Sequence, residues 1–463
     1  MTEPVTGKPL LWLVAIAFFM QTLDGTIVNT ALPSMAKALN ESPLNMQSVI
    51  EAYLLTVAIL IPASGWLADR FGTRKIFILA ITLFGLGSFC CAQSQSLNQL
   101  VASRVLQGIG GSLMLPVGRL AILRTIPRRT FLAAMSFVVM PGLIGPVIGP
   151  ALGGFLVEVA TWHWVFLINI PVAIIGLIIA CKVMPDIRYP RPEHFDYCGF
   201  LILAGAMASL TIGLDLLSHQ KSGSSTAVIY LSVGFLLGGG YWLLAYYQKT
   251  PLFPPRLFKV RTFTIGALAN VFYRMGTGAM PLLIPLYLQL GQGFSPFYAG
   301  LSMIPIALFA MIAKKYVVQL IHRFGYRNVL LTVCLLQTLC IASFALTNSL
   351  FPTILVQLSI LGALNSITFS CIGTISLRDL NNELASSGNS LLSVLQQLGF
   401  SLGTACGATL LAIFYRISPD GKDMLWGFNH TFLTIACIVM IPIFLYLMLP
   451  HDAPKQKKRI HNT

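Results

Sequence analysis

Apolar residues occur along this chain in long stretches that only short polar segments interrupt. A helix needs about 20 consecutive apolar residues to cross the hydrocarbon core of a bilayer. Measured against that length, the pattern predicts fourteen membrane-spanning helices, at residues 10–32, 47–68, 76–93, 99–123, 131–157, 163–184, 197–217, 226–247, 263–290, 297–320, 328–346, 351–376, 386–413 and 428–449. The predicted fold class is therefore an all-α polytopic membrane protein.

The composition agrees with a chain that faces lipid. Of its 463 residues, 56% are hydrophobic and 10% are charged, whereas soluble domains carry roughly 25% charged residues. A net charge of +15 would suggest a nucleic-acid partner in a soluble protein. Here the basic residues lie in short loops between apolar runs, so we expect no nucleic-acid partner. The nine cysteines show no metal-ligand spacing, and we expect neither a metal site nor a cofactor.

The basic residues also predict the orientation of the chain. Suppose that the N-terminus is cytoplasmic. Of the 30 lysines and arginines, only Lys37, Lys221, Arg416 and Lys422 then fall in outer loops. Arg104, Arg119 and Arg274 lie within spans, and the others lie in inner segments or, as Lys182, Lys314 and Lys315 do, toward the inner ends of spans. Loops rich in lysine and arginine stay in the cytoplasm and contact anionic lipids there. We therefore expect both termini to be cytoplasmic.

A short motif occurs twice. Residues 69–74 read DRFGTR and residues 322–327 read HRFGYR, 253 positions later. The same offset carries the start of the first span, residue 10, to residue 263, where the ninth span begins. Parallel repeats of this kind build transporters with a substrate site between their halves. The predicted domains are a six-helix bundle (1–184), two inserted helices (185–250), a second six-helix bundle (251–449) and a basic cytoplasmic tail (450–463).

The first copy lies in a longer string, 65–75, that resembles the signature loop of the major facilitator superfamily. In such a loop, glycine permits a tight reversal of the chain and an acidic side chain can pair with an arginine. The resemblance implies a conformational latch formed by Gly65, Asp69, Arg70, Gly72 and Arg74. The second copy has His322 in place of Asp69, so an acidic latch is expected on one side only.

Three further strings resemble motifs of fourteen-span drug:proton antiporters: LDGTIVNTALP (23–33), RVLQGIGG (104–111) and GLIGPVIGPALGG (142–154). Glycines spaced by four form a smooth stripe that lets another helix approach closely, and prolines bend the helix. The antiporter motif comprises Gly142, Gly145, Pro146, Gly149, Pro150, Gly153 and Gly154. The resemblance implies a monomer of the bacterial inner membrane that exports small molecules in exchange for protons.

Ionisable residues inside membrane spans are costly and mark functional sites. At a rise of 1.5 Å per residue, Asp24 lies about 21 Å and Arg104 roughly 22 Å from the cytoplasmic surface. Burial favours the neutral form of a carboxyl group and a nearby guanidinium favours the charged form, so Asp24 is the expected proton-coupling group and Arg104 its modulator. The alternative is a permanent ion pair that only fixes helix packing. Glu51, near an outer boundary, is expected to be solvated.

Several other polar residues within the spans are expected to line a substrate cavity. They are Gln21, Asn29, Arg119, Asn270, Arg274 and Gln396. With one acid, Asp24, and two buried guanidiniums, Arg104 and Arg274, such a cavity favours anionic, zwitterionic or neutral substrates over permanent cations. Guanidinium groups bind carboxylates through two hydrogen bonds. Export of carboxylate metabolites or of metal chelates such as citrate or siderophores is therefore an alternative to the export of small amphipathic drugs.

Other functional classes fit less well. An ATP-driven pump needs a nucleotide domain, but no GxxxxGK[ST] string occurs. No cluster of catalytic polar residues indicates a membrane enzyme. A non-transporting sensor on a transporter scaffold is the alternative of another class, and proton flux in proteoliposomes would separate the two.

Overall fold

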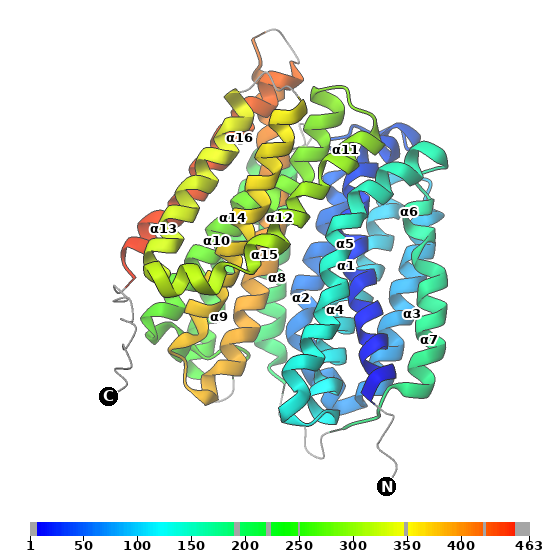
Figure 1. The fold of residues 1–463 in the computed structure, drawn as a ribbon, viewed down its shortest axis with the longest axis vertical. Helices are drawn as coiled ribbons and strands as arrows, with labels where there is room; N and C mark the ends of the chain where they lie inside the picture. Colours follow the sequence, from blue (N-terminus) through cyan, green and yellow to red (C-terminus); the bar gives the residue numbers. More distant parts are fainter. Residues whose placement is uncertain are drawn as a thin grey trace, which may run out of the picture.

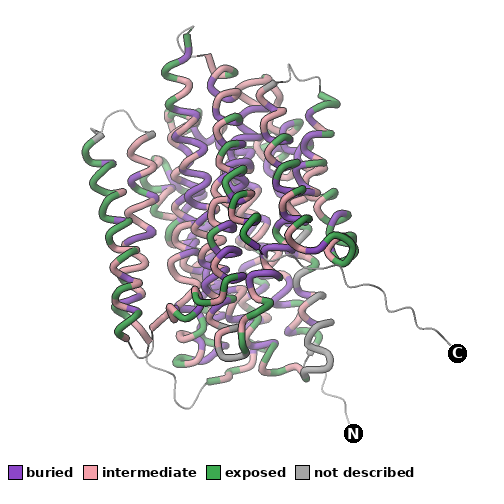
Figure 2. Tube along the Cα trace, turned by 90° about the vertical axis from the view of Figure 1, so that its left-hand side faces the viewer, coloured by how far each residue is buried: buried purple, intermediate pink, exposed green. Residues whose placement is uncertain are grey.

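The structure, a computed structural model, describes residues 7–188, 195–218, 224–248, 251–346, 351–419 and 423–449. These residues form a bundle of long, roughly parallel helices without strands (Figure 1). Buried positions are concentrated in the centre of the bundle and exposed positions on its outer faces (Figure 2). The predicted tail, 450–463, lies outside the described residues, as do the basic residues Arg191, Lys221, Lys249 and Lys422.

The first half consists of seven helices: α1 (Gly7–Ala38), α2 (Gln47–Phe71), α3 (Thr73–Ala92), α4 (Leu97–Thr125), α5 (Arg128–Val159), α6 (Trp164–Leu167) and α7 (Asn169–Val183). Helix α1 packs along α5, and α4 packs against both α2 and α3. The short α6 and the longer α7 together occupy the sixth predicted span, 163–184.

The second half contains α10 (Arg261–Leu286), α11 (Pro296–Ser302), α12 (Ile304–Lys314), α13 (Val317–Leu346), α14 (Phe351–Arg378), α15 (Asn382–Ile417) and α16 (Met424–Leu447), with the one-turn segments η1 (Pro255–Lys259) and η2 (Tyr287–Gly291). Helix α10 packs against α15 and α16, and α12 packs against α14. The short helices α11 and α12 together occupy the tenth predicted span, 297–320, so the helices of each half correspond to six predicted spans.

The two inserted helices, α8 (Tyr197–Ser218) and α9 (Ser224–Tyr247), pack mainly on each other. Helix α8 also contacts α2 of the first half and α15 of the second. Asp196 holds the start of α8 to the segment after α9, because its carboxylate accepts hydrogen bonds from Gln248 Nε2 at 3.2 Å and from the Leu252 amide at 3.1 Å. The exact domain boundaries at 184 and 250 stay predictions.

Thirteen helices of the described residues are long and apolar enough to span a membrane. The predicted span 263–290, which corresponds to α10 starting at Arg261, is not among these thirteen helices. Polar residues such as Asn270 and Arg274 lower its hydropathy, yet most of the helix is buried between its neighbours. Because it faces protein rather than lipid, its composition resembles a soluble core more than a lipid-exposed helix. A fourteenth span at α10 therefore stays a prediction.

The repeat extends to the backbone of the two loops. Gly72 has φ 97° and Gly325, 253 residues later, has φ 76°. Glycine populates positive φ at no steric cost, which explains its presence in both copies of the motif. We call the end of the molecule that carries these two glycines the inner end and the opposite one the outer end, after the predicted orientation.

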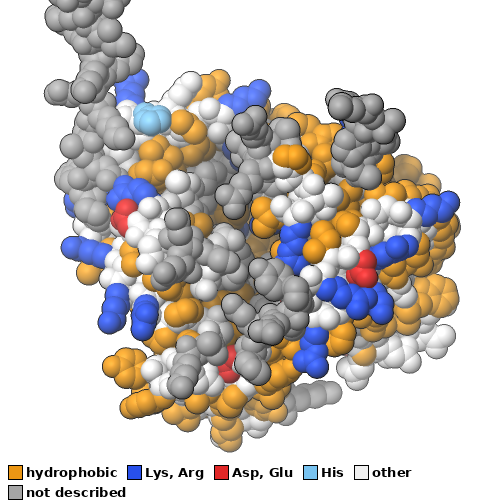
Figure 3. Space-filling model, turned by 90° about the horizontal axis from the view of Figure 1, so that it is seen from below, with side chains coloured by type: hydrophobic (Ala, Val, Ile, Leu, Met, Phe, Trp, Pro, Cys, Tyr) orange, Lys and Arg blue, Asp and Glu red, His pale blue; other side chains and the backbone are white. Residues whose placement is uncertain are grey.

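The inner end is rich in basic side chains (Figure 3). Lysine and arginine are spread across both halves of this face, and few acidic groups are visible beside them. Among the exposed residues here are Arg70, Arg74, Lys75, Lys314, Lys315 and Arg323. This distribution supports the predicted cytoplasmic position of the inner end.

Candidate transport site

The two charges predicted to meet in the first half are in contact. Arg104 Nη1 on α4 lies 2.7 Å from Asp24 Oδ2 on α1, and the two side chains are 1% and 0% exposed. The guanidinium also donates from Nε to the Val49 carbonyl of α2 at 3.2 Å and lies 4.3 Å from the centre of the Tyr53 ring. The pair therefore joins α1, α2 and α4.

Amide side chains complete the hydrogen bonding of Asp24. Its Oδ1 accepts bonds of 2.8 Å from Gln107 Nε2 and from Asn169 Nδ2. Gln107 also donates to Ser88 Oγ at 2.7 Å and accepts from Arg104 Nη1 at 2.7 Å. Buried charges are tolerated when they are paired and fully hydrogen-bonded. This network meets that requirement for the Asp24–Arg104 pair.

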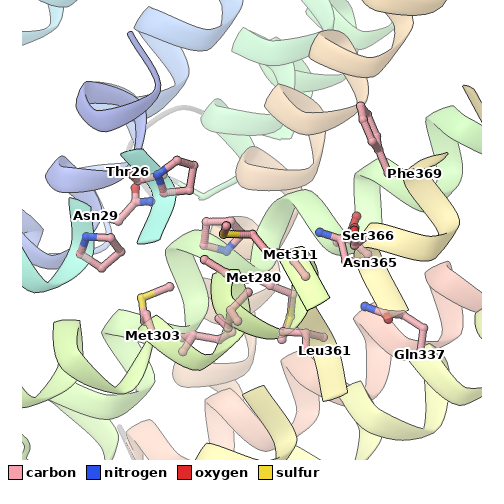
Figure 4. A pocket seen from close by; sticks show the side chains of 18 of the residues that line it. Thr26, Asn29, Met280, Met303, Met311, Gln337, Leu361, Asn365, Ser366 and Phe369 are labelled. Carbon is pink, nitrogen blue, oxygen red and sulfur yellow. The ribbon is translucent and has the colours of Figure 1, made fainter. Parts of the chain in front are cut away.

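A cavity of about 300 Å³ lies between the halves. The first half contributes Thr26, Asn29, Pro146 and Pro150, and α10, α12, α13 and α14 contribute the rest, together with Met303 between α11 and α12. In Figure 4, Thr26 and Asn29 face Asn365, Ser366 and Gln337 across a middle section that holds Met280 and Met311, and Met303 lies below Asn29. Lys314 is the only ionisable side chain among the described residues that line the cavity.

The helical turn of α1 separates the ion pair from the cavity. Each residue advances by about 100°, so Asn29 lies near the direction of Gly25, whereas Asp24 points toward α4. Asn29 Oδ1 is buried without a hydrogen-bond partner. Asp24 therefore does not line the cavity in this structure, but it belongs to the helix that forms one of its walls.

Of the six residues predicted to line the cavity, only Asn29 does so. Gln21 lies one turn before Gly25, and its Oε1 is buried without a partner. Arg119 is exposed on α4. Asn270 is 1% exposed within α10, and Gln396 lies on α15. Contact of these residues with a substrate stays a prediction.

Arg274 of α10 lies behind the cavity wall. Its guanidinium carbon is 4.7 Å from the centre of the Phe369 ring, and Phe369 lines the cavity. The buried Nε atom of Arg274 has no hydrogen-bond partner, and no carboxylate lies within ion-pair distance among the described residues. This cation differs from Arg104 in having an aromatic face as its principal compensation.

The predicted glycine stripe of α5 packs against a stripe of threonines on α1. A side chain at Gly145, Gly149 or Gly153 would collide with Thr22, Thr26 or Thr30, respectively. The close approach lets Thr30 Oγ1 donate to the Pro150 carbonyl at 3.1 Å. At Gly142, the Phe18 ring occupies the space that a side chain would take. Any movement of α1 must therefore carry α5 with it, or must part this interface.

The outer end is closed by contacts between α5 and α11. Gly154 of α5 packs on the Pro296 carbonyl, and Gly300 of α11 packs on the Pro150 carbonyl. Glu158 Oε2 accepts hydrogen bonds from Ser295 Oγ at 3.1 Å and from the Phe297 amide at 3.3 Å. Such backbone-to-backbone packing excludes water, so in this conformation the two halves meet at the outer end.

The predicted latch ties two helices of the first half together. Asp69 Oδ1 lies 2.6 Å from Arg124 Nη2 of α4, and the Arg70 guanidinium lies 5.1 Å from the centre of the Trp66 ring. Gly72 packs on Asp186, while Gly65 and Arg74 are exposed. These contacts lie within the first half or, for Gly72, with the segment that follows α7. A contact of the latch with the second half stays a prediction.

Sequence reasoning missed the amide partners of Asp24 and much of the cavity wall. Gln107 lies within the string RVLQGIGG, and Asn169, Gln337 and Asn365 are amides inside apolar runs. That shared signal, an amide within a membrane span, could have identified all four. The sequence counts Lys314 among the basic residues of the inner end, and hydropathy does not show that this last residue of α12 lines the cavity.

Comparisons with known proteins agree with this architecture. The Major Facilitator Superfamily model matches residues 14–404. "Putative multidrug resistance protein MdtD" of Pectobacterium atrosepticum is 48% identical over 462 residues, covering 98% of each chain. The protein of the same name from Serratia proteamaculans is 49% identical over 448 residues, covering 96% of this chain and 93% of its own. The strings around Arg119 and at 274–278 predict this closer similarity to MdtD-type exporters, and it is confirmed.

Solved structures with little sequence identity share the fold. A bacterial homolog of the human lysosomal transporter Spinster, in an inward-facing conformation, has a TM-score of 0.68 at 15% identity and covers 96% of this chain and 97% of its own. The nucleoside transporter NupG has a TM-score of 0.64 at 16% identity, with 95% and 98% covered. The motifs, the two parallel bundles and these relatives together show that the chain is a multi-pass membrane transporter of small molecules that belongs to the major facilitator superfamily.

Proposed function

We propose that this protein is a proton-driven exporter of small amphipathic molecules that works by alternating access. The observation that carries the proposal is the cavity between the halves, closed at the outer end by α5 and α11 and lined by apolar, methionine and amide side chains. Its composition suits molecules with both apolar and hydrogen-bonding groups. The names of the MdtD relatives support drug efflux, and the family supports proton coupling.

Asp24 is the proposed proton-binding group. Protonation would remove its charge and with it most of the attraction of Arg104, so the link between α1 and α4 would weaken. Helix α1 packs on α5 through the threonine and glycine stripes, and α5 forms the outer closure with α11. A proton at Asp24 would thereby favour opening of the outer end. This path runs through contiguous packed elements, as coupling between sites requires.

We further infer that the protein lies in the bacterial inner membrane with both termini in the cytoplasm and acts as a monomer, as a transporter and not as an enzyme. Inverted membrane vesicles test the transport proposal. A panel of labelled amphipathic compounds is offered with and without an imposed proton gradient. We expect gradient-dependent uptake of at least one compound, absent from vesicles without the protein. Uptake that is equal with and without the gradient would contradict proton coupling.

Carboxylate substrates, including metal chelates such as citrate complexes, are the second candidate. The specific observation is Arg274, a buried guanidinium without a carboxylate partner behind Phe369, together with Lys314 in the cavity wall and no acidic lining residue among those described. A rotation of Phe369 would expose the guanidinium to the cavity, and a substrate carboxylate could supply the hydrogen bonds that Nε lacks.

If carboxylates are the substrates, Arg274→Ala should affect the uptake of an anionic probe but not that of a cationic probe in the same vesicles. Citrate uptake should fall at least tenfold in Arg274→Ala, whereas uptake of the lipophilic cation tetraphenylphosphonium should be unchanged or absent in both proteins. Arg119→Ala is the matched control, because Arg119 is an exposed arginine outside the cavity. Transport of the cation that is insensitive to Arg274→Ala, with no response to any carboxylate, would rule this candidate out. A protein that moves neither probe nor protons would instead fit a sensor.

A further inference from the structure

A second acidic residue is buried in the first half, away from the transport site. Glu51 lies one turn into α2 at the outer end, where the sequence predicts a solvated side chain. That expectation is wrong: Glu51 is 4% exposed, and its Oε1 atom is fully buried without a hydrogen-bond partner. An ionised carboxylate in such a place would lose its hydration without compensation.

The neighbourhood of Glu51 adds a second negative charge. Gln47 and Glu51 are one turn apart on the same face of α2, and Gln47 Nε2 donates to Asp215 Oδ1 of α8 at 2.8 Å. The Asp215 charge acts on Glu51 through space. Two carboxylates that share a site cannot both ionise easily. Burial and the neighbouring charge therefore both disfavour the ionised form of the Glu51 carboxyl group.

The basic side chains on the helices around Glu51 do not lie on its face of α2. Arg104 contacts Val49 and Tyr53 of α2, and these two residues share a face that points roughly opposite to that of Glu51. Asp24 is paired with Arg104 on that same far side. On α15, which packs against α2, the nearest charge is Arg416 at the helix end. Among these groups, Asp215 is the one whose charge acts on Glu51.

The position joins all three parts of the fold. Helix α2 belongs to the first half, α15 to the second, and α8 to the inserted pair, and the three pack on one another. Thr409 Oγ1 of α15 donates to the Leu214 carbonyl of α8 at 2.9 Å, next to Asp215. Parting the halves at the outer end must separate α2 from α15 and admit water to Glu51.

We propose that Glu51 is a second proton-binding site, which holds a proton while α8 and α15 pack against α2 and releases it when the outer end opens. The inserted helices then have a role: α8 supplies the carboxylate that keeps Glu51 neutral. Because closing takes up one proton, acidity outside favours the closed state. The ratio of closed to open molecules should change by up to about tenfold per pH unit between the proton affinities of the two states.

Infrared spectroscopy of the purified wild-type protein in nanodiscs tests the proposal without any transported substrate, so its outcome is separate from that of the proposed export. We expect a protonated-carboxyl C=O band at neutral pH that is lost in Glu51→Gln and retained in Glu41→Gln, a glutamate of the preceding outer loop. In Asp215→Asn the band should disappear at a lower pH than in the wild type.

Wild-type protein without such a band between pH 5 and 9 would overturn the proposal, whatever the variants do. So would a band that survives in Glu51→Gln and is lost in Asp24→Asn, which would place the buried proton on the transport pair instead. An Asp215→Asn titration identical to that of the wild type would remove the role assigned to α8.

Discussion

The two halves of the molecule have the same arrangement of helices but differ in the charged side chains that they bury. At the repeat offset of 253, Asp24 and Arg104 of the first half correspond to Thr277 and Gln357 of the second. The first half therefore buries an ion pair with a complete hydrogen-bond network, whereas the second has neutral polar side chains at the same places. Conversely, Gln21 corresponds to Arg274, the buried guanidinium for which the described part of the chain supplies no carboxylate partner.

The difference separates two uses of buried charge in one fold. A satisfied pair fixes helix packing and can change when one partner takes up a proton. An unsatisfied cation lowers stability but is ready to bind an anion. We infer that the first half handles the proton and that the second contributes the charge that selects the substrate.

Arg104→Ala should have the largest effect on stability. Removing the guanidinium leaves Asp24 charged and buried without its partner, which costs about 3–5 kcal/mol. The control is Gln357→Ala at the corresponding position of the second half, where loss of the 2.9 Å bond to Ser343 should cost roughly 1–2 kcal/mol. The measurement is the free energy of unfolding in mixed micelles. Equal losses in both variants would contradict the asymmetry between the halves.

Arg274→Met should change stability in the opposite direction. Methionine fills a similar volume and removes an unpaired buried charge, so we expect a gain of about 1–3 kcal/mol in the free energy of unfolding. Transport of citrate, if the wild type carries it, should be lost in the same variant, as expected where a site is strained for function. A destabilised variant would show that Arg274 is compensated within the protein.

Gly72→Ala should destabilise the inner loop by about 1–2 kcal/mol, because φ is 97° and the new methyl group would meet the Asp186 carboxylate. Gly325→Ala, at φ 76°, should cost about 1 kcal/mol. Gly65→Ala is the control: Gly65 is helical with open space around it, and alanine there should stabilise by up to about 1 kcal/mol. Thermal unfolding of the three variants ranks the effects; the same shift in all three would refute the role of positive φ.

The smallest effect concerns pH at the inner end of the second half. The hydrogen bond from Arg378 lowers the pKa of Asp379, and one from Thr262 acts in the same direction. A lowered folded-state pKa adds stability above the unfolded value of about 3.9, and this contribution is lost as the pH falls through the folded value. Because Asp379 is 45% exposed, the contribution is well under 1 kcal/mol. Asp379→Asn should reduce the loss of melting temperature between pH 6 and pH 3, and an unchanged difference would show that this contact contributes nothing.

The sequence predicts the helices and the repeat well, because span length and loop charge depend only on short segments of the sequence. It also places Asp24 beside Arg104, because the two lie at equal depth and the family resemblance implies that their helices line the same cavity. It fails for Glu51, where depth suggests water but α8 and α15 cover the side chain. It fails for most of the cavity wall as well, because the face that a helix turns toward the centre depends on packing, as Asp24 and Asn29 on α1 illustrate.

Proton movement by Asp24→Asn proteoliposomes tests the division of labour between the halves most directly. The protein is reconstituted with a pH-sensitive dye inside the vesicles and is given a compound that the wild type carries in the vesicle screen. We predict that Asp24→Asn still exchanges labelled for unlabelled compound but no longer moves protons when the compound is added. Proton movement equal to that of the wild type would show that Asp24 is a packing residue and that the coupling group lies elsewhere.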